Sequence, residues 1–226
     1  MIVLQDVTKL YDGVAAVQDV SVAVARGEFA FLIGSNGAGK TTLIKLIIRE
    51  ERPDAGVVLV GGVDVARLSG VGLTKLRRRI GVVFQDTRLL PNATVAENVA
   101  LPMQVRGHGG QELTTAVKTV LGRVGLEGFD VRYPRQLSGG EQRKAAIARA
   151  IVAHPEFLLC DEPTDSLSPP IAREIVELLL SINSDGVTTI VATHDRDIVN
   201  SLRRRVIHMD SGHIHADTAV GQFNVI

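Results

Sequence analysis

The sequence lacks several features on which other classes of protein depend. Its 226 residues include a single cysteine, no tryptophan and only 4% aromatic residues. One cysteine cannot form a disulfide within the chain, so a disulfide-stapled fold is excluded and a reducing cytosol is the expected setting. Because this cysteine, Cys160, lies in an apolar run, we interpret it as a small buried hydrophobic residue.

An excess of charge and a long apolar run are also missing. Lysine and arginine number 25, aspartate and glutamate also number 25, and the net charge is zero, which argues against wholesale nucleic-acid binding. No stretch approaches the roughly 20 apolar residues that span a bilayer. The first six residues have no basic region, so we expect no secretory signal. We expect a protein that is soluble by itself and reaches a membrane only through a partner.

The apolar residues that are present, 45% of the chain, predict strands and helices in alternation. Residues 1–33 read as antiparallel strands that lead into one buried strand at 29–33, and a helical stripe runs from Leu43 to about Arg49. Further strands are predicted at 57–60, 80–84, 157–160, 188–192 and 206–209, and further helices at 73–79, 95–101, 112–124, 141–153, 170–182 and 196–201. This alternation is typical of a parallel sheet covered on both faces. The last dozen residues carry little signal.

A glycine-rich segment between the strand at 29–33 and the following helix has the spacing of a phosphate-binding loop. Its glycines let consecutive backbone N–H groups curl around phosphate oxygens, and the helix start adds the positive end of its dipole. We expect Lys40 to reach the β- and γ-phosphates and Thr41 to ligate Mg²⁺. An ordinary glycine-rich turn is the alternative, which the flanking strand and helix disfavour. The expected nucleotide-binding residues are Gly34, Ser35, Asn36, Gly37, Ala38, Gly39, Lys40, Thr41 and Thr42.

Two neighbouring acids, Asp161 and Glu162, end the apolar strand at 157–160. Strands of one sheet end at the same edge, so both carboxylates are expected beside the phosphate loop. We assign Asp161 to the Mg²⁺ shell and Glu162 to the general base that activates the attacking water. By itself such a pair is more often a solvated strand end, and the upstream loop reverses those odds.

The segment Leu137-Ser-Gly-Gly-Glu141 offers a second anion-binding surface. Ser138 is a good helix N-cap, and two glycines leave the N–H groups of the helix start bare. A second phosphate site is redundant within one molecule, so we expect Ser138, Gly139, Gly140 and Glu141 to face the γ-phosphate held by another copy. A simple capped helix is the alternative on spacing alone, and both interpretations stay open.

Three further residues are ambiguous by themselves. His194 follows a strand and is more often a packed or surface residue. Gln85 follows the strand at 80–84 and could touch Mg²⁺ or the attacking water. Tyr11 could stack on a base or belong to the core.

Taken together, these residues resemble the ATP-binding cassette (ABC) ATPases over nearly the whole chain. The family's adenine platform, glutamine loop and switch histidine correspond to Tyr11, Gln85 and His194, and its phosphate loop, signature and acidic strand end to the segments above. The resemblance implies Mg²⁺-dependent ATP hydrolysis, with Glu162, His194, Lys40 and Gln85 catalytic and with Thr41, Gln85 and Asp161 at the metal. It also implies a homodimer that sandwiches ATP.

The implied fold is an α/β P-loop NTPase core with a mostly parallel sheet, an antiparallel β subdomain and an inserted α-helical subdomain. The whole chain, 1–226, is then one nucleotide-binding domain. Residues 1–90 and 155–226 are expected to form the core and the β subdomain, and residues 91–154 the helical subdomain with the signature.

Several stretches, above all 80–92 and 94–102, look like the cell-division branch of this family. That likeness implies a bacterial protein on the cytoplasmic face of the cell membrane, where it works with a membrane protein to control cell-wall hydrolases. Lipoprotein-release and macrolide-export ATPases share much of residues 80–102 and remain alternatives. A DNA-repair ATPase is disfavoured because the interval between loop and signature has neither heptads nor cysteines.

Two positions depart from the family's pattern after the acidic pair. Ser168 replaces an aspartate that helps to couple the two sites of the dimer, and Asp165 adds a charge where the family has a small residue. These changes put the hydrolysis rate in doubt, so a nucleotide-gated scaffold with negligible turnover is kept as an alternative.

Overall fold

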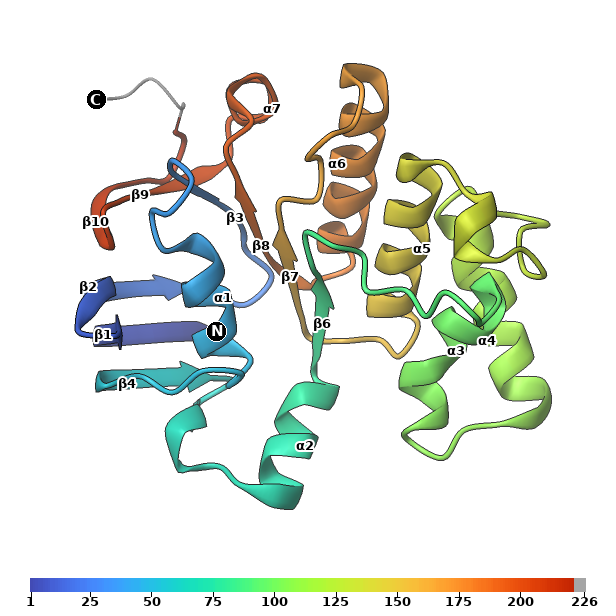
Figure 1. Cartoon of the computed structure of the whole chain (residues 1–226), viewed down its shortest axis with the longest axis horizontal. Helices are drawn as coiled ribbons and strands as arrows, with labels where there is room; N and C mark the ends of the chain where they lie inside the picture. Colours follow the sequence, from blue (N-terminus) through green and yellow to red (C-terminus); the bar gives the residue numbers. More distant parts are fainter. Residues whose placement is uncertain (222–226) are drawn as a thin grey trace.

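The computed structural model describes residues 1–221 and contains two β-sheets with helices around them (Figure 1). One sheet has the strand order β2-β1-β4-β5 and the other the order β10-β9-β3-β8-β7-β6. Among the described residues, no helix has the length and apolar content needed to cross a membrane.

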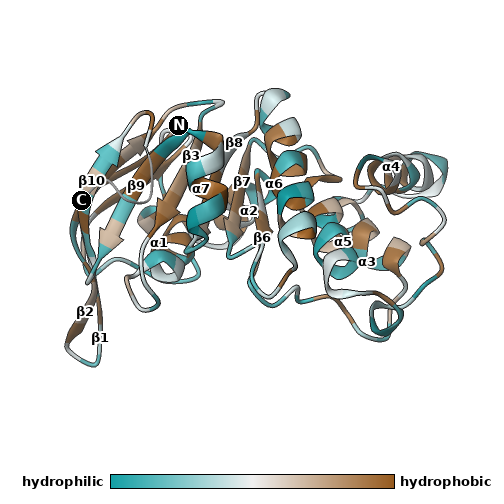
Figure 2. Cartoon of the chain, turned by 90° about the horizontal axis from the view of Figure 1, so that it is seen from above, coloured by the Kyte–Doolittle hydropathy of each residue, from teal (hydrophilic) through white to brown (hydrophobic). Residues whose placement is uncertain are grey.

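The four-stranded sheet is antiparallel. It consists of β1 (Ile2–Tyr11), β2 (Val14–Val24), β4 (Ala55–Val60) and the short β5 (Val63–Asp64). The hairpin between β1 and β2 turns at Asp12 and Gly13, both with positive φ, as a tight two-residue turn requires. Its tip projects from the body of the molecule (Figure 2).

The six-stranded sheet is parallel except at one edge. Its strands are β3 (Phe29–Ile33), β6 (Ile80–Val83), β7 (Phe157–Asp161), β8 (Thr188–Thr193), β9 (Arg205–Asp210) and β10 (His213–Thr218), and only β10 runs antiparallel to its neighbour. Every residue of β3, β7 and β8 is buried, as expected for strands covered on both faces.

Helices cover both faces of this sheet. They are α1 (Lys40–Ile47), α2 (Gly70–Arg78), α3 (Val95–Gln104), α4 (Gly110–Arg123), α5 (Gly139–Ile151), α6 (Pro169–Ser184) and α7 (Arg196–Leu202). One hydrophobic core includes α1 and residues of both sheets, and a second joins the opposite face of the large sheet to α3, α4, α5 and α6. In Figure 1, α3 and α4 stand apart from the antiparallel sheet, on the far side of β6 and β7.

The mostly parallel sheet, the antiparallel sheet and the helices predicted from the sequence are confirmed, but two strands were missed. β5 has only two residues. In β10 the exposed His213, His215 and Asp217 alternate with half-buried Ile214, Ala216 and Thr218, and this pattern lacks the strongly apolar face that marks a buried strand. Of the last dozen residues, whose sequence gives little indication of structure, residues 222–226 lie outside the described residues.

Candidate active site

The loop between β3 and α1 is a cradle that only glycine permits at two places. Gly34 and Gly39 have φ of +155° and +102°, and a Cβ would lie 2.3 Å from the Met209 carbonyl oxygen at Gly34 and 2.4 Å from that of Ala16 at Gly39. The loop is therefore pressed against β2 and β9, and no larger residue would let its backbone approach them.

Lys40, the first residue of α1, is buried and its ammonium group lies under the loop. Its Nζ donates to the carbonyl oxygens of Gly34 at 2.8 Å and Ser35 at 3.1 Å. It also lies 3.3 Å from Oε1 of Glu162, in an ion pair whose two side chains are almost fully buried. The loop, its lysine and the acidic strand end predicted from the sequence thus meet in space.

Glu162 connects this lysine to the predicted switch histidine. Its Oε2 lies 2.9 Å from Nδ1 of His194 and accepts the His194 backbone N–H at 3.2 Å. Glu162 has a φ of +46°, which lies in the left-handed region, and its side chain is only 7% exposed. The backbone at the end of β7 therefore bends sharply and turns this carboxylate between Lys40 and His194.

Asp161 lies next to a cavity of about 390 Å³ that Thr41 and Gln85 also line. Its Oδ1 is buried without a hydrogen-bond partner. Burial raises the pKa of the Asp161 carboxyl, while the hydroxyl of Thr41 acts in the opposite direction. Carboxylate, hydroxyl and amide oxygens are the ligands that Mg²⁺ prefers, and an unpartnered buried carboxylate oxygen is suited to a cation, so these residues fit a magnesium site.

A second cavity, of about 530 Å³, shares Thr41 and Gln85 with the first. The phosphate loop lines it together with Tyr11, Gln85 and Glu162. Tyr11 comes from the end of β1 and is 38% exposed, with the ammonium of Lys9 5.3 Å from its ring centre. An exposed ring beside the loop is suited to stacking on a base.

The predicted second anion surface is separate from both cavities, since none of residues 138–141 lines them. Ser138 and Glu141 form a capping box at the start of α5, in which the Glu141 carboxylate accepts the Ser138 backbone N–H at 2.7 Å. That hydrogen bond lowers the pKa of Glu141. A Cβ on Gly140 would lie 2.7 Å from Cγ2 of Ile171, whereas on Gly139 it would make an ordinary contact of 3.6 Å with Leu167. Glu141 and Gly140 therefore have roles within the chain.

Sequence reasoning missed Arg143, and it named Asp165 only as an added charge without its contact to Gln85. Arg143, buried in α5, donates to the carbonyl oxygens of Phe84 at 2.7 Å and Gln85 at 2.9 Å. Asp165 accepts the side-chain amide N–H of Gln85 at 3.3 Å. The signal for Arg143 was its position four residues before Ile147 on the apolar face of α5, where a charge needs a buried partner.

Comparisons with known proteins agree with this geometry. Residues 17–165 match the family described as "ABC transporter". The cell division ATP-binding protein FtsE of Streptococcus pneumoniae (serotype 2, strain D39) is 44% identical over 99% of this chain and 97% of its own length. The methionine import ATP-binding protein MetN of Caulobacter vibrioides is 43% identical over 97% of this chain and 67% of its own length.

A solved structure resembles almost the whole chain. The ATP-binding cassette MJ0796, described as a dimeric post-hydrolysis state bound to ADP and Pi, has a TM-score of 0.89 and 33% sequence identity, and the match covers 99% of this chain and 100% of that one.

Proposed function

The chain belongs to the ABC transporter family and is an ABC ATPase, and from this premise we propose that it drives a membrane complex of the FtsE type in bacterial cell division. The observation that carries the proposal is the convergence of Lys40, Glu162 and His194 under a phosphate loop, in a chain similar to FtsE over almost its whole length. FtsE is the name of the relative, and the cell-division role is our inference from it.

In the proposed reaction, ATP and water give ADP and phosphate. The loop from Gly34 to Thr42 holds the phosphates through its backbone N–H groups, and Tyr11 stacks on the adenine. Lys40 reaches the β- and γ-phosphates, whose oxygens replace the loop carbonyls as its partners. Glu162 accepts the proton of the attacking water, and His194 holds the Glu162 carboxylate in position.

The metal-binding roles go to Thr41, Gln85 and Asp161, which lie around one cavity. Mg²⁺, when bound, supplies positive charge against the charge that develops on the phosphate oxygens. Asp161 contributes a carboxylate oxygen that has no other hydrogen-bond partner, and Thr41 a hydroxyl oxygen at the second position of α1.

The segment Ser138–Glu141 serves a second copy of the chain in this proposal. Its exposed N-terminal end, with bare N–H groups at Gly139 and Gly140, faces the γ-phosphate bound by the other copy. Two copies then enclose two ATP molecules, and hydrolysis opens the pair. The dimeric state of the related cassette MJ0796 supports this arrangement.

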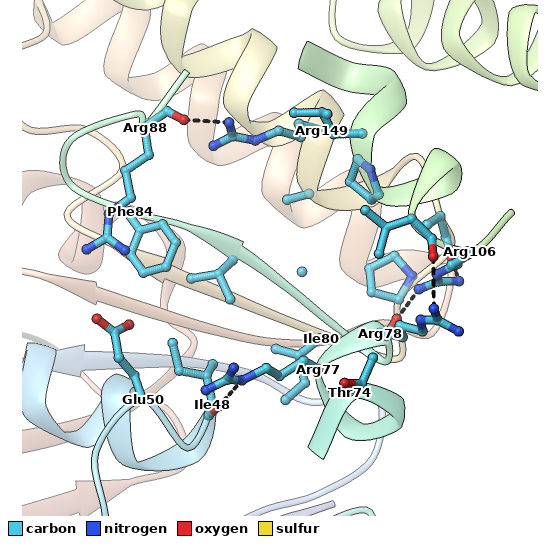
Figure 3. A pocket seen from close by; sticks show the side chains of 18 residues that line it. Ile48, Glu50, Thr74, Arg77, Arg78, Ile80, Phe84, Arg88, Arg106 and Arg149 are labelled. Atoms are coloured by element: carbon cyan, nitrogen blue, oxygen red, sulfur yellow. Dashed lines mark hydrogen bonds between the residues drawn. The ribbon is translucent and has the colours of Figure 1, made fainter. Parts of the chain in front are cut away.

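A groove of about 770 Å³ is the proposed contact for the membrane partner, an FtsX-like protein (Figure 3). Apolar residues such as Leu101, Pro102 and Val105 line part of it. Several guanidiniums border it and donate to main-chain carbonyls, Arg78 to Val105 and Arg149 to Arg88. Arg88 pairs with Asp86 at 3.2 Å, whereas Arg78 and Arg149 form no ion pair among the described residues. The guanidiniums of Arg78 and Arg149 therefore fit a helical segment of the partner that carries an acid. Docking there would hold the protein peripherally on the cytoplasmic face of the bacterial membrane.

The test of this proposal has two arms. We expect the purified chain to hydrolyse ATP with Mg²⁺ and Lys40→Ala to abolish most of that activity, because the phosphates lose their buried cation. We also expect the chain to co-purify with an FtsX-like membrane protein from the cells that produce it. If neither the unmodified chain nor Lys40→Ala hydrolysed ATP, the ATPase role would be contradicted. Co-purification with a different membrane protein would contradict the cell-division role.

The second arm also separates the alternatives. Co-purification with a transporter permease would favour a lipoprotein-release, macrolide-export or methionine-import type of complex, the last because MetN is nearly as similar as FtsE. For the complex with the FtsX-like protein, the proposed output is control of peptidoglycan hydrolases outside the membrane.

A nucleotide-gated scaffold with negligible turnover is a second candidate because of the segment after Glu162. Ser168 occupies the N-cap position of α6, yet its side chain makes no capping hydrogen bond. A hydroxyl here cannot supply the charge of an aspartate across a dimer. ATP binding with turnover no faster than that of Lys40→Ala would favour the scaffold.

A further inference from the structure

We propose that Asp165 is a positioning residue that sets which end of the Gln85 side-chain amide faces the metal. This inference deepens the proposed function and depends on it for the role of Gln85. Its starting observation is the hydrogen bond from Nε2 of Gln85 to Oδ2 of Asp165, 3.3 Å long, between segments 80 residues apart in sequence.

The chemistry of an amide makes this contact directional. A carboxylate only accepts hydrogen bonds, so it attracts the NH₂ end of the amide and repels the oxygen end. With Nε2 fixed at Asp165, the oxygen Oε1 is the end that remains for a cation. Mg²⁺ takes oxygen ligands and cannot use the NH₂ group, so only one of the two amide orientations is productive.

Gln85 is placed where this choice matters. It lines the cavity of Thr41 and Asp161 as well as the cavity of the phosphate loop and Glu162. Its backbone is already fixed, because the guanidinium of Arg143 binds the carbonyl oxygens of Phe84 and Gln85. These main-chain bonds do not fix the orientation of the Gln85 side chain, and Asp165 supplies a hydrogen-bond partner for it.

Asp165 is itself held in place by its own segment of the backbone. Its backbone N–H donates to the carbonyl oxygen of Glu162 at 3.2 Å, and the next turn closes with a bond of 3.2 Å from Leu167 to Thr164. Ser166 between them has a φ of +60°, which tightens the segment. Leu167 packs against the second hydrophobic core. Asp165 thus ties the segment that follows Glu162 to the segment that carries Gln85.

The test measures metal-dependent nucleotide binding, so it does not depend on turnover. All variants are made in the full chain with Glu162→Gln, which removes the proposed base, and the dissociation constant of ATP is measured by calorimetry with Mg²⁺ and with EDTA. We expect Asp165→Ala to reduce the Mg²⁺-dependent gain in affinity about tenfold, since hydrogen bonds to charged groups are among the stronger ones. The affinity in EDTA should stay within about twofold.

Two comparisons separate positioning from simple charge. Asp165→Asn keeps an acceptor oxygen, but its NH₂ group can bind Oε1 instead, so it should retain part of the gain, more than Asp165→Ala and less than the parent. A gain equal to that of the parent would overturn the orientation argument, and a loss as large as that of Asp165→Ala would overturn the hydrogen-bond argument. Asp185→Ala is the matched control, because it removes an exposed acid whose carboxylate binds Arg123 at 2.6 Å and which lines neither cavity. It should leave the gain unchanged, and a loss as large as that of Asp165→Ala would also overturn the argument.

A double-mutant cycle with Gln85→Ala decides whether Asp165 acts through Gln85. We expect Asp165→Ala to have little further effect once Gln85→Ala is present, and additive effects would overturn the inference. If Asp165→Ala melts at a much lower temperature than the parent, Asp165→Ser takes its place in the same cycle. A parent that binds no ATP would contradict the proposed function, while a parent with a normal gain that Asp165→Ala leaves intact would contradict only this inference.

Discussion

At the scale of single residues, Glu162 is the point where the site is held together. One carboxylate oxygen lies against the ammonium of Lys40 and the other against the ring nitrogen and backbone N–H of His194. Buried charges of this kind are costly to leave unpaired, so each partner constrains the other two. The side chains proposed to bind phosphate and to activate water are therefore coupled to one another.

This coupling makes His194 a positioning residue that can be tested. In His194→Ala the Glu162 carboxylate loses its Nδ1 partner, and we expect the ATPase rate to fall by about a hundredfold or more, as when a general base is disabled. The affinity for ATP should remain within about twofold, because His194 does not line the cavity of the phosphate loop. Steady-state hydrolysis and equilibrium binding measure the two effects.

His213→Ala is the control for that measurement, since it removes an exposed histidine of β10. It should change neither rate nor affinity. Hydrolysis by His194→Ala at the rate of the unmodified chain would show that Glu162 does not need this partner.

The residues of the site differ in how visible they are from sequence. Glycines, a lysine and a threonine at fixed spacing identify the phosphate loop because each answers a local requirement of the backbone or of phosphate. Arg143 and Asp165 act at a distance, on main-chain carbonyls and on an amide in a segment about 60 and 80 residues away. Every residue has a main-chain carbonyl, so the sequence does not show which carbonyls Arg143 binds.

At the scale of elements, the start of α5 combines two demands. Its N-terminus is proposed to face a second copy, yet it also packs closely on α6 through Gly140 and Ile171. The sequence alone left open whether the two glycines expose N–H groups or serve ordinary packing. The geometry assigns Gly140 a packing role, and Gly139 is left with space around its Cα.

These two glycines should therefore respond differently to the same substitution. Gly140→Ala places a Cβ 2.7 Å from Ile171 Cγ2, and we expect it to destabilise the fold by about 1–3 kcal/mol through overpacking. Gly139→Ala should be neutral or stabilising by about 0.5–1 kcal/mol, because alanine loses less entropy than glycine in a helix. Urea denaturation of both variants measures the difference.

Ile171→Ala provides a further check, since it removes the side chain that the new Cβ would meet. Combined with Gly140→Ala, it should cost less than the sum of the two single substitutions. Equal stability of Gly140→Ala and Gly139→Ala would mean that α5 and α6 separate easily and that the close contact does not constrain them.

At the scale of the whole molecule, the features of the fold that could be predicted are those that follow from local sequence patterns. Apolar strands alternating with helices indicated a mostly parallel sheet, and that is the sheet observed. The strand order was not visible, because β3 pairs with β8 and β9, more than 150 residues later, through backbone groups that have no sequence signature. β10 was missed because one face of the strand has two histidines and an aspartate, all exposed, and the other face has residues that are only half-buried.

The same scale decides whether two copies complete the site. We expect the Glu162→Gln variant, which should bind ATP without hydrolysing it, to change from the 24.2 kDa of one chain to about twice that mass when ATP is added. The physical reason is that each copy's phosphate loop and the other copy's Ser138–Glu141 segment would bind the same nucleotide, so part of the binding energy is released only on association. Light scattering coupled to gel filtration measures the mass with and without nucleotide.

Gly139→Glu in the same background tests where the second copy binds. Gly139 is exposed and a Cβ there makes only an ordinary contact, so the added side chain can extend into solvent. Its carboxylate would point a negative charge at the phosphates of the other copy, and like charges repel when water is excluded. We expect this variant to bind ATP and stay monomeric, with Gly139→Ala as the uncharged control that still dimerises. A Gly139→Glu variant that dimerises with ATP as readily as its parent would place the contact between copies elsewhere on the molecule.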